Sequence, residues 1–259
     1  MVKFRDGWVR LVFVLALLLP VWFLVAALGT KFGLLDWRIG FGLMVFRLGA
    51  LLLLGVLGLS VIGLLLALLV KPRRGWGRAL AALLIPALAL GFAASVMSKA
   101  RAVPPIHDIS TNIEDPPVFS RTVLDARGAV GGSNPVRSLT EPSPALNGRS
   151  VGEAGRAAYP DIAPVTLAGT VPESLERAAA AARDLGLKDV RIDKAAGTVE
   201  AVAESFWFGF RDDVVIRVRP GPDGQGSVVD IRSTSRVGQS DLGANAARVR
   251  ALITAIKAG

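Results

Sequence analysis

The 259-residue sequence contains no cysteine and a single histidine. The lack of cysteine excludes disulfide bonds, thiolate metal sites and a thiol nucleophile. His107 alone supplies too few nitrogen ligands for a zinc site, and neither HExxH nor a paired-histidine spacing occurs. The GxSxG motif, the Walker A motif and a glycine-rich dinucleotide turn are also missing. We therefore expect no metal and no cofactor.

Acidic residues are scarce in the first part of the chain. Residues 1–98 contain ten Lys/Arg and two Asp/Glu, a net charge of +8, whereas the whole chain carries +9. The rest of the chain balances twenty basic residues against nineteen acidic ones. The basic excess therefore relates to membrane topology and not to phosphate binding. We do not expect nucleic acid as a partner.

Three stretches without any charge are long enough to cross the roughly 30 Å hydrocarbon core of a bilayer. They comprise residues 11–30, 48–70 and 79–98. The first resembles a signal peptide, but its length and the two further spans favour an uncleaved helix. Residues 36–47, which include Arg47, are expected to form a tilted or interfacial lead-in to the second span. Residues 1–100 are thus predicted to form a three-helix anchor in the lipid bilayer.

The distribution of basic residues predicts the orientation of this anchor. Lys3, Arg5 and Arg10 precede the first span, and four basic residues occupy the short second loop. By the positive-inside rule these two regions are cytoplasmic. With three spans, the C-terminal part then lies outside the cytoplasm. We expect a bacterial inner-membrane protein with a periplasmic C-terminal domain.

Residues 101–164 show no sustained helical or strand period and contain nine prolines. Such a stretch is either a disordered tether or an extended wrap over a folded domain. Its two ends mix apolar and polar residues and are expected to be ordered, whereas residues 129–148 look loose.

Residues 165–259 have regular patterns. Thr170 and Glu173 fit a capping box that starts a helix ending at Gly186. Alternating residues predict four strands, at 189–194, 198–204, 213–219 and 226–233, each pair joined by a short turn. A last helix is expected over 241–257, with Ser240 as its N-cap. We predict an α+β two-layer domain in which both helices cover one face of an antiparallel four-strand sheet.

The densest polar cluster joins the last strand to the last helix, over residues 232–241. Hydroxyl and guanidinium groups ahead of a helix N-terminus are able to bind a phosphate or carboxylate headgroup. The alternative is a loop held together by local hydrogen bonds and Arg–Asp pairs. The candidate binding residues are Arg211, Asp212, Asp213, Arg232, Ser233, Ser235, Arg236, Ser240, Asp241 and Asn245.

Residues 206–210 place four aromatic side chains within five positions. They cannot all face the same side of a strand, so some are expected to contact lipid or a partner. Burial beneath residues 106–119 is the other interpretation.

Several motifs resemble the family catalogued as domain of unknown function 1499. They are IHDIST at 106–111, DPPxF at 115–119, AYPDI at 158–162, WFGFxDDVV at 207–215 and VDIRSxSRVGxSDLGxN at 229–245. The resemblance covers residues 104–257 and implies a bacterial envelope protein, often with N-terminal membrane helices. It implies no activity and no site residues.

Two functional hypotheses follow. The first is a non-enzymatic envelope module that binds a partner protein or a lipid headgroup through the 232–241 loop. The second is an envelope enzyme acting on a lipid or cell-wall substrate, with Asp212, Asp213, Ser235 and Asp241 as candidate acid, base or nucleophile.

Overall fold

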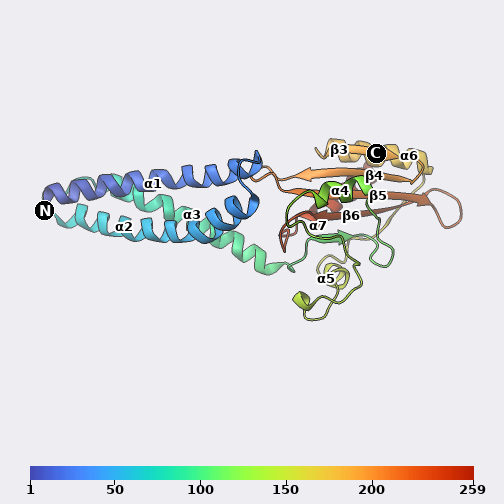
Figure 1. Cartoon of the computed structure of the whole chain (residues 1–259), viewed down its shortest axis with the longest axis horizontal. Coiled ribbons are helices and arrows are strands. Elements are labelled where there is room, and N and C mark those ends of the chain that lie inside the picture. The colour runs from blue at the N-terminus through green and yellow to red at the C-terminus, as the bar shows by residue number, and fades with distance from the viewer. The chain divides into compact units, whose positions relative to one another are not determined.

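The computed structural model describes all 259 residues, which form two compact units (Figure 1). The first unit comprises residues 1–98 together with Phe206–Gly209. The second comprises residues 99–205 and 210–259.

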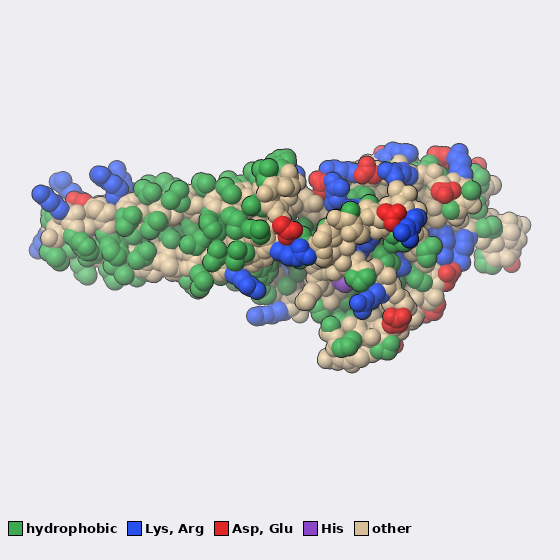
Figure 2. Space-filling view, in the orientation of Figure 1, with side chains coloured by type: hydrophobic (Ala, Val, Ile, Leu, Met, Phe, Trp, Pro, Cys, Tyr) green, Lys and Arg blue, Asp and Glu red, His purple; other side chains and the backbone are tan.

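The first unit contains three helices long and apolar enough to cross a membrane. They are α1 (Val2–Lys31), the continuous pair η1 (Arg38–Gly49) and α2 (Ala50–Leu69), and α3 (Trp76–Ala102). Hydrophobic side chains cover much of the visible face of these helices (Figure 2). The prediction of three long apolar helices is confirmed. The lead-in to the second span is a π-helix that runs directly into α2, so both form one helical segment of 32 residues.

Small residues bring these helices close together. A Cβ atom at Gly40 of η1 would lie 1.9 Å from Oγ1 of Thr30 on α1, so only glycine fits. Ser60 of α2 donates a hydrogen bond to the carbonyl of Ala82 on α3 at 3.0 Å. Such small and hydroxyl-bearing contacts are typical of helix packing in lipid. Arg5 is buried and donates to the carbonyls of Val70 and Pro72, which fixes the loop after α2 against α1.

The second unit is built on a six-stranded antiparallel sheet. Its strands are β1 (Asp108–Ser110), β2 (Val165–Leu167), β3 (Lys188–Asp193), β4 (Thr198–Glu204), β5 (Arg211–Pro220) and β6 (Ser227–Ser235). The order is β1-β6-β5-β4-β3, and β2 pairs with β6 as well. The predicted number of four strands is therefore wrong. The two extra strands have three residues each, which is too short for a period-2 pattern to be detected.

Helices α6 (Val171–Asp184) and α7 (Ala244–Ala258) cover the apolar face of the sheet. Val214, Ile216 and Val218 of β5 and the neighbouring Ile231 of β6 pack there, all nearly inaccessible to solvent. The predicted capping box of α6 is present, because Thr170 Oγ1 accepts from the Glu173 amide and the Glu173 carboxylate accepts from the Thr170 amide. Both helices thus lie on one face, as predicted.

The last helix begins later than predicted. It starts at Ala244 after Gly243, whose φ of 85° requires a residue without a Cβ atom. Ser240 is not the N-cap, because its hydroxyl accepts from the Leu242 amide within the preceding turn.

The opposite face of the sheet is charged, and residues 111–150 lie over it. This segment contains α4 (Arg121–Gly128) and the single turn η2 (Pro144–Leu146), and α5 (Val151–Ala158) follows it. Ser120, the N-cap of α4, donates from its amide and hydroxyl to the Glu200 carboxylate of β4. The part of the charged face around Asp213 and Arg232 is consequently covered, whereas Arg219 remains 42% exposed.

Candidate functional site

Asp213 lies between two arginines on the charged face. Its carboxylate accepts from the guanidinium of Arg236 at 2.7 and 3.0 Å and from Arg127 Nη1 at 2.6 Å. Arg127 also donates to the carbonyls of Asn134 and Ser235. Asp213 is 0% exposed, Arg127 3% and Arg236 6%. Charges this deeply buried are tolerated only when they are fully paired, so this cluster fixes α4 to the sheet.

Arg232 forms a second buried pair on the same face. It donates to both carboxylate oxygens of Asp108 in β1, at 2.8 and 3.0 Å. A further bond of 2.9 Å reaches the carbonyl of Arg137, and the guanidinium lies 5.9 Å from the ring centre of Phe119. Arg232 therefore joins β1, β6 and the covering segment.

A third group of charges lies further along the strands. Arg217 and Arg219 of β5 both donate to the buried carboxylate of Asp230 on β6, at 2.9 and 2.7 Å. Both also bond Asp115 of the covering segment. The hydrogen bond from Arg217 lowers the pKa of Asp115 below its usual range. All three groups attach residues 108–137 to the strands.

Asn245 is the centre of a polar network on the opposite, helix-covered face. Its Nδ2 donates to the carbonyl of His107 at 3.1 Å and to Ser235 Oγ at 3.0 Å. Its Oδ1 accepts from Ser233 Oγ at 2.6 Å and from Arg248 Nη1. Asn245 is fully buried. The amide thus connects the start of α7 to the end of β6 and to the entry of β1.

Asp241 lies just before α7, and its carboxylate accepts hydrogen bonds from two backbone amides. Oδ1 accepts from Gly243 at 2.8 Å and Oδ2 from Asn245 at 2.9 Å. Burial raises the pKa of Asp241 above its usual range, and the negative charge of Asp212 raises it further. No ion pair with an arginine is formed by Asp241, in contrast to Asp212 and Asp213.

The ten predicted site residues are thus divided between two faces of the sheet. Asp213, Arg232 and Arg236 lie on the charged face beneath the covering segment. Asp212, Ser233, Ser235, Asp241 and Asn245 gather at the start of α7, with Ser240 in the turn before it. Arg211 joins neither group and pairs with Glu204 at 3.4 Å. The binding role of the 232–241 loop stays a prediction, but its two guanidinium groups are each paired with a buried aspartate.

The candidate acid, base and nucleophile are likewise engaged. Asp212 pairs with Arg248 at 2.8 Å, and Asp213 with two arginines. Ser235 Oγ accepts from the amide of Asn245 and bonds no carboxylate, so no base is in place to activate it. Of the three carboxylates, Asp241 alone combines a raised pKa with freedom from an ion pair.

A groove of about 340 Å³ lies beside this network. Its walls come from the turn between α6 and β3, the end of β4 and one side of α7. The lining is mostly small or aliphatic, with one charge of each sign: Leu185, Gly186, Leu187, Ala203, Glu204, Ala247, Arg248 and Ala251. Arg248 thus belongs both to the Asn245 network and to the groove.

Two separate sets of ion pairs involve the charged residues of the groove. Glu204 bonds Lys188 at 2.9 Å and Arg211 at 3.4 Å, while Arg248 pairs with Asp212. The hydrogen bond from Lys188 lowers the pKa of Glu204 below its usual range. Glu204 and Arg248, which line the groove, together with their partners amount to three cations and two carboxylates.

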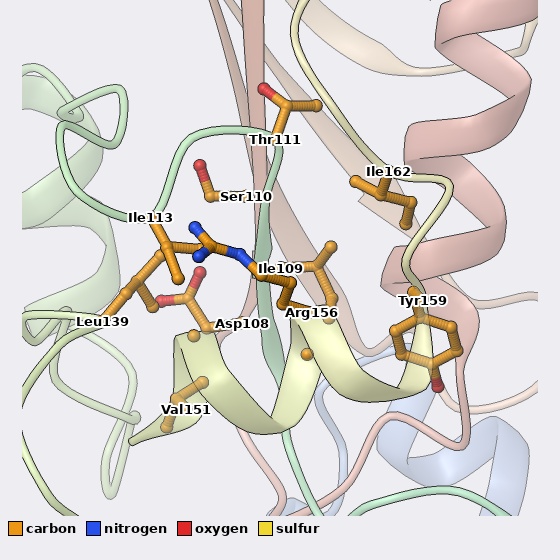
Figure 3. Close-up of a pocket in the computed structure, with 12 residues that line it drawn as sticks. Asp108, Ile109, Ser110, Thr111, Ile113, Leu139, Val151, Arg156, Tyr159 and Ile162 are labelled. Carbon is orange, nitrogen blue, oxygen red and sulfur yellow. The ribbon is translucent and has the colours of Figure 1, made fainter. Parts of the chain in front are cut away.

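A second cavity lies between β1 and α5 (Figure 3). Its lining includes Ile109, Thr111, Tyr159 and Ile162, and Arg156 reaches along α5 toward Ile113 to pair with Glu114 at 2.7 Å. At about 20 Å³ it has room for a single water molecule. This cavity is too small for a substrate.

Arg127, Arg248 and Asp108 are absent from the predicted site residues, although each anchors part of the polar networks. A signal for α4, which carries Arg127, was available in Ser120, an N-cap residue. Ser150 and Glu153 form a capping box at α5 that was equally readable. Nothing local indicates that Arg127 pairs with Asp213, 86 residues away.

Comparisons with known proteins identify the C-terminal part of the chain. A family model described as "protein of unknown function (DUF1499)" matches residues 108–256. No curated protein and no solved structure matches the chain. No group of three or more His, Asp or Glu side chains is arranged to hold a metal ion.

Proposed function

Since the chain belongs to the DUF1499 family of proteins of unknown function, we propose from its geometry that it is a membrane-anchored binding module for a lipid with an anionic headgroup. The observation that carries the proposal is the groove between α6, β4 and α7, with apolar walls and a polar rim. Its volume of about 340 Å³ falls within the range of small-molecule sites.

The apolar walls fit a hydrocarbon chain. Ala247 and Ala251 follow each other at i and i+4 on α7, and their short side chains leave space opposite Leu185 and Leu187. A lipid tail is as well solvated in a bilayer as in such a groove, so the tail alone gives no selectivity. Discrimination between lipids must come from the rim.

The rim favours an anionic headgroup. Lys188, Arg211 and Arg248 carry one more charge than their partners Glu204 and Asp212. Lys188 and Arg211 are more than half exposed, so they are free to add a phosphate oxygen to their existing bonds. This differs from the buried Arg232 and Arg236, whose donors face protein acceptors.

Photolabelling of the full chain in lipid nanodiscs tests the proposal. The probe is phosphatidylglycerol with a diazirine in its acyl chain, compared with the phosphatidylcholine analogue. We expect the anionic probe to label peptides that contain residues 185–187 and 247–251 more strongly than the zwitterionic one. Ala247→Trp, which fills the groove, should abolish this labelling, whereas Ala180→Trp on the exposed side of α6 should not. Equal labelling in both variants, or capture of a protein through the groove without lipid, would refute the proposal.

The orientation of the module is part of the same proposal. The four basic residues of the loop after α2 and those before the first span support a cytoplasmic N-terminus and a periplasmic C-terminal domain in a bacterial inner membrane. A reporter that is active only outside the cytoplasm, fused after Gly259, should be active. A stable but silent fusion would contradict this orientation.

A second candidate function, an envelope enzyme, is favoured by one observation only, the raised pKa of Asp241. The carboxylate is held by two backbone amides at the start of α7, which is a structural role. Hydrolysis of a lipid ester by the purified protein that is lost in Asp241→Asn, with the fold retained, would favour the enzyme over the binding module.

A further inference from the structure

We propose that Phe206 and Trp207, in the loop between β4 and β5, are an interfacial membrane anchor that inserts at the headgroup level of the bilayer crossed by α1–α3. The proposal does not depend on the lipid groove. It assigns a role to an aromatic cluster that neither the sheet core nor the polar networks use.

The two side chains are exposed despite their size. Phe206 is 74% exposed and Trp207 55%. Their rings meet edge to face at a centroid distance of 5.1 Å, so they form one apolar projection. The loop is closed at its base by Ser205, whose amide donates to the Phe210 carbonyl and whose hydroxyl accepts from the Phe210 amide. The aromatic tip is therefore held on a short, well-defined turn.

Contacts within the first unit indicate the occupant of this surface. Residues 206–209 belong to the same compact unit as the apolar helices. Lys31 Nζ bonds the carbonyl of Phe206 at 2.6 Å and lies 4.7 Å from the centre of its ring. The ring of Phe208 packs edge to face against the ring of Phe41 in η1, with a distance of 5.0 Å between the ring centroids. The loop is thus attached to the end of the first apolar helix.

The position of Lys31 indicates how deep Phe206 is expected to lie in the bilayer. It directly follows the charge-free stretch 11–30, where a lysine marks the boundary between hydrocarbon and headgroups. A residue bonded to Lys31 lies at the same level. Aromatic side chains, and Trp above all, are enriched at this level because their rings are apolar and their edges polar. Phospholipid therefore suits these two rings better than water does, since more than half of each side chain remains exposed.

The cysteine-free sequence makes the test direct, since a single introduced cysteine is a unique labelling site. Phe206→Cys carries a spin label in the full chain reconstituted into lipid nanodiscs, with Trp207 retained. The matched control is Val118→Cys, which replaces another apolar residue of 74% exposure in the second unit. The measurement is the accessibility of each label to oxygen, which concentrates in lipid, and to a water-soluble nickel complex.

We expect the ratio of oxygen to nickel accessibility to be clearly higher at 206 than at 118, since both reagents reach the headgroup level whereas nickel dominates in water. A ratio at 206 equal to that at 118 places the label in water and overturns the proposal. A label at 206 protected from both reagents is buried against protein, such as a second copy or a partner, and overturns it too. If Phe206→Cys does not fold, as judged by circular dichroism, Trp207→Cys with Phe206 retained tests the same loop by the same criterion, since Trp207 is 55% exposed.

Discussion

Replacing Asp213 with asparagine should be among the most destabilising single changes in the second unit. The substitution removes the charge that Arg127 and Arg236 share and leaves two guanidinium groups buried without a counterion. Breaking a buried ion pair by removing one partner costs about 3–5 kcal/mol. For a urea dependence of about 2 kcal/mol per molar, within the usual range for small domains, the unfolding midpoint should fall by about 2 M. Pulse proteolysis of the full chain in detergent, followed over urea concentration, measures this midpoint.

Two controls make the result specific. Asp125→Asn removes the exposed i,i+4 partner of Arg121, and pairs of this kind contribute only about 0.3–0.5 kcal/mol. A triple variant with Arg127→Met, Asp213→Leu and Arg236→Met should recover most of the lost stability, because an apolar replacement removes all the buried charges together. The reasoning fails if Asp213→Asn shifts the midpoint no more than Asp125→Asn does.

Three further predictions address other contacts. Arg232→Met should release β1 and the covering segment, so that trypsin cuts within residues 111–150 faster than in wild type, whereas Asp125→Asn, which loses only the exposed pair with Arg121 and keeps every trypsin site of the segment, should leave the rate unchanged. The raised pKa of Asp241 stabilises the fold below the ordinary carboxyl pKa of about 3.9, and this contribution is lost as the pH rises through the higher folded-state pKa; the midpoint of Asp241→Asn minus that of wild type should therefore increase from pH 3.5 to pH 7, and a flat difference would contradict the shift. Gly226→Ala should destabilise by more than Gly224→Ala, since both have positive φ but only at 226 would the Cβ atom lie 2.3 Å from the Leu167 carbonyl oxygen; equal urea midpoints would show that the close approach relaxes freely.

Much of the fold was predictable because it depends on local periodicity. The three apolar helices follow from charge-free stretches, and the alternation along β5 separates Val214 and Ile216 from Asp213 and Arg217. The capping box at Thr170 located the start of α6 to the residue. The extra strands β1 and β2 escaped prediction because three residues give no period, and because their pairing with β6 joins positions that are distant in sequence, such as Asp108 with Thr234 and Val165 with Val229.

The candidate site was predictable in composition but not in arrangement. The cluster 232–241 was identified as polar, yet alternation along β6 sends Arg232 to one face and Ser233 to the other. A linear motif therefore contributes to two separate networks. Arg127 and Arg248 complete those networks from helices, and their roles depend on tertiary contacts that no local pattern encodes. The groove likewise depends on how α6 and α7 pack, since its alanines are unremarkable in sequence.

The pairing of β1 with β6 also determines how late the second unit can complete its sheet during synthesis of the chain. Asp108 and Arg232 are 124 residues apart, so β1 has no partner until nearly the whole chain has been made. At about 5–20 residues per second, a ribosome needs roughly 6–25 s to cover that distance. Throughout this interval β1 and the covering segment must stay soluble without β6 to pair with. The prolines and polar residues of the covering segment are compatible with such an unfolded state. Closure of the domain is therefore a late event in biosynthesis, after the membrane helices have already been synthesised.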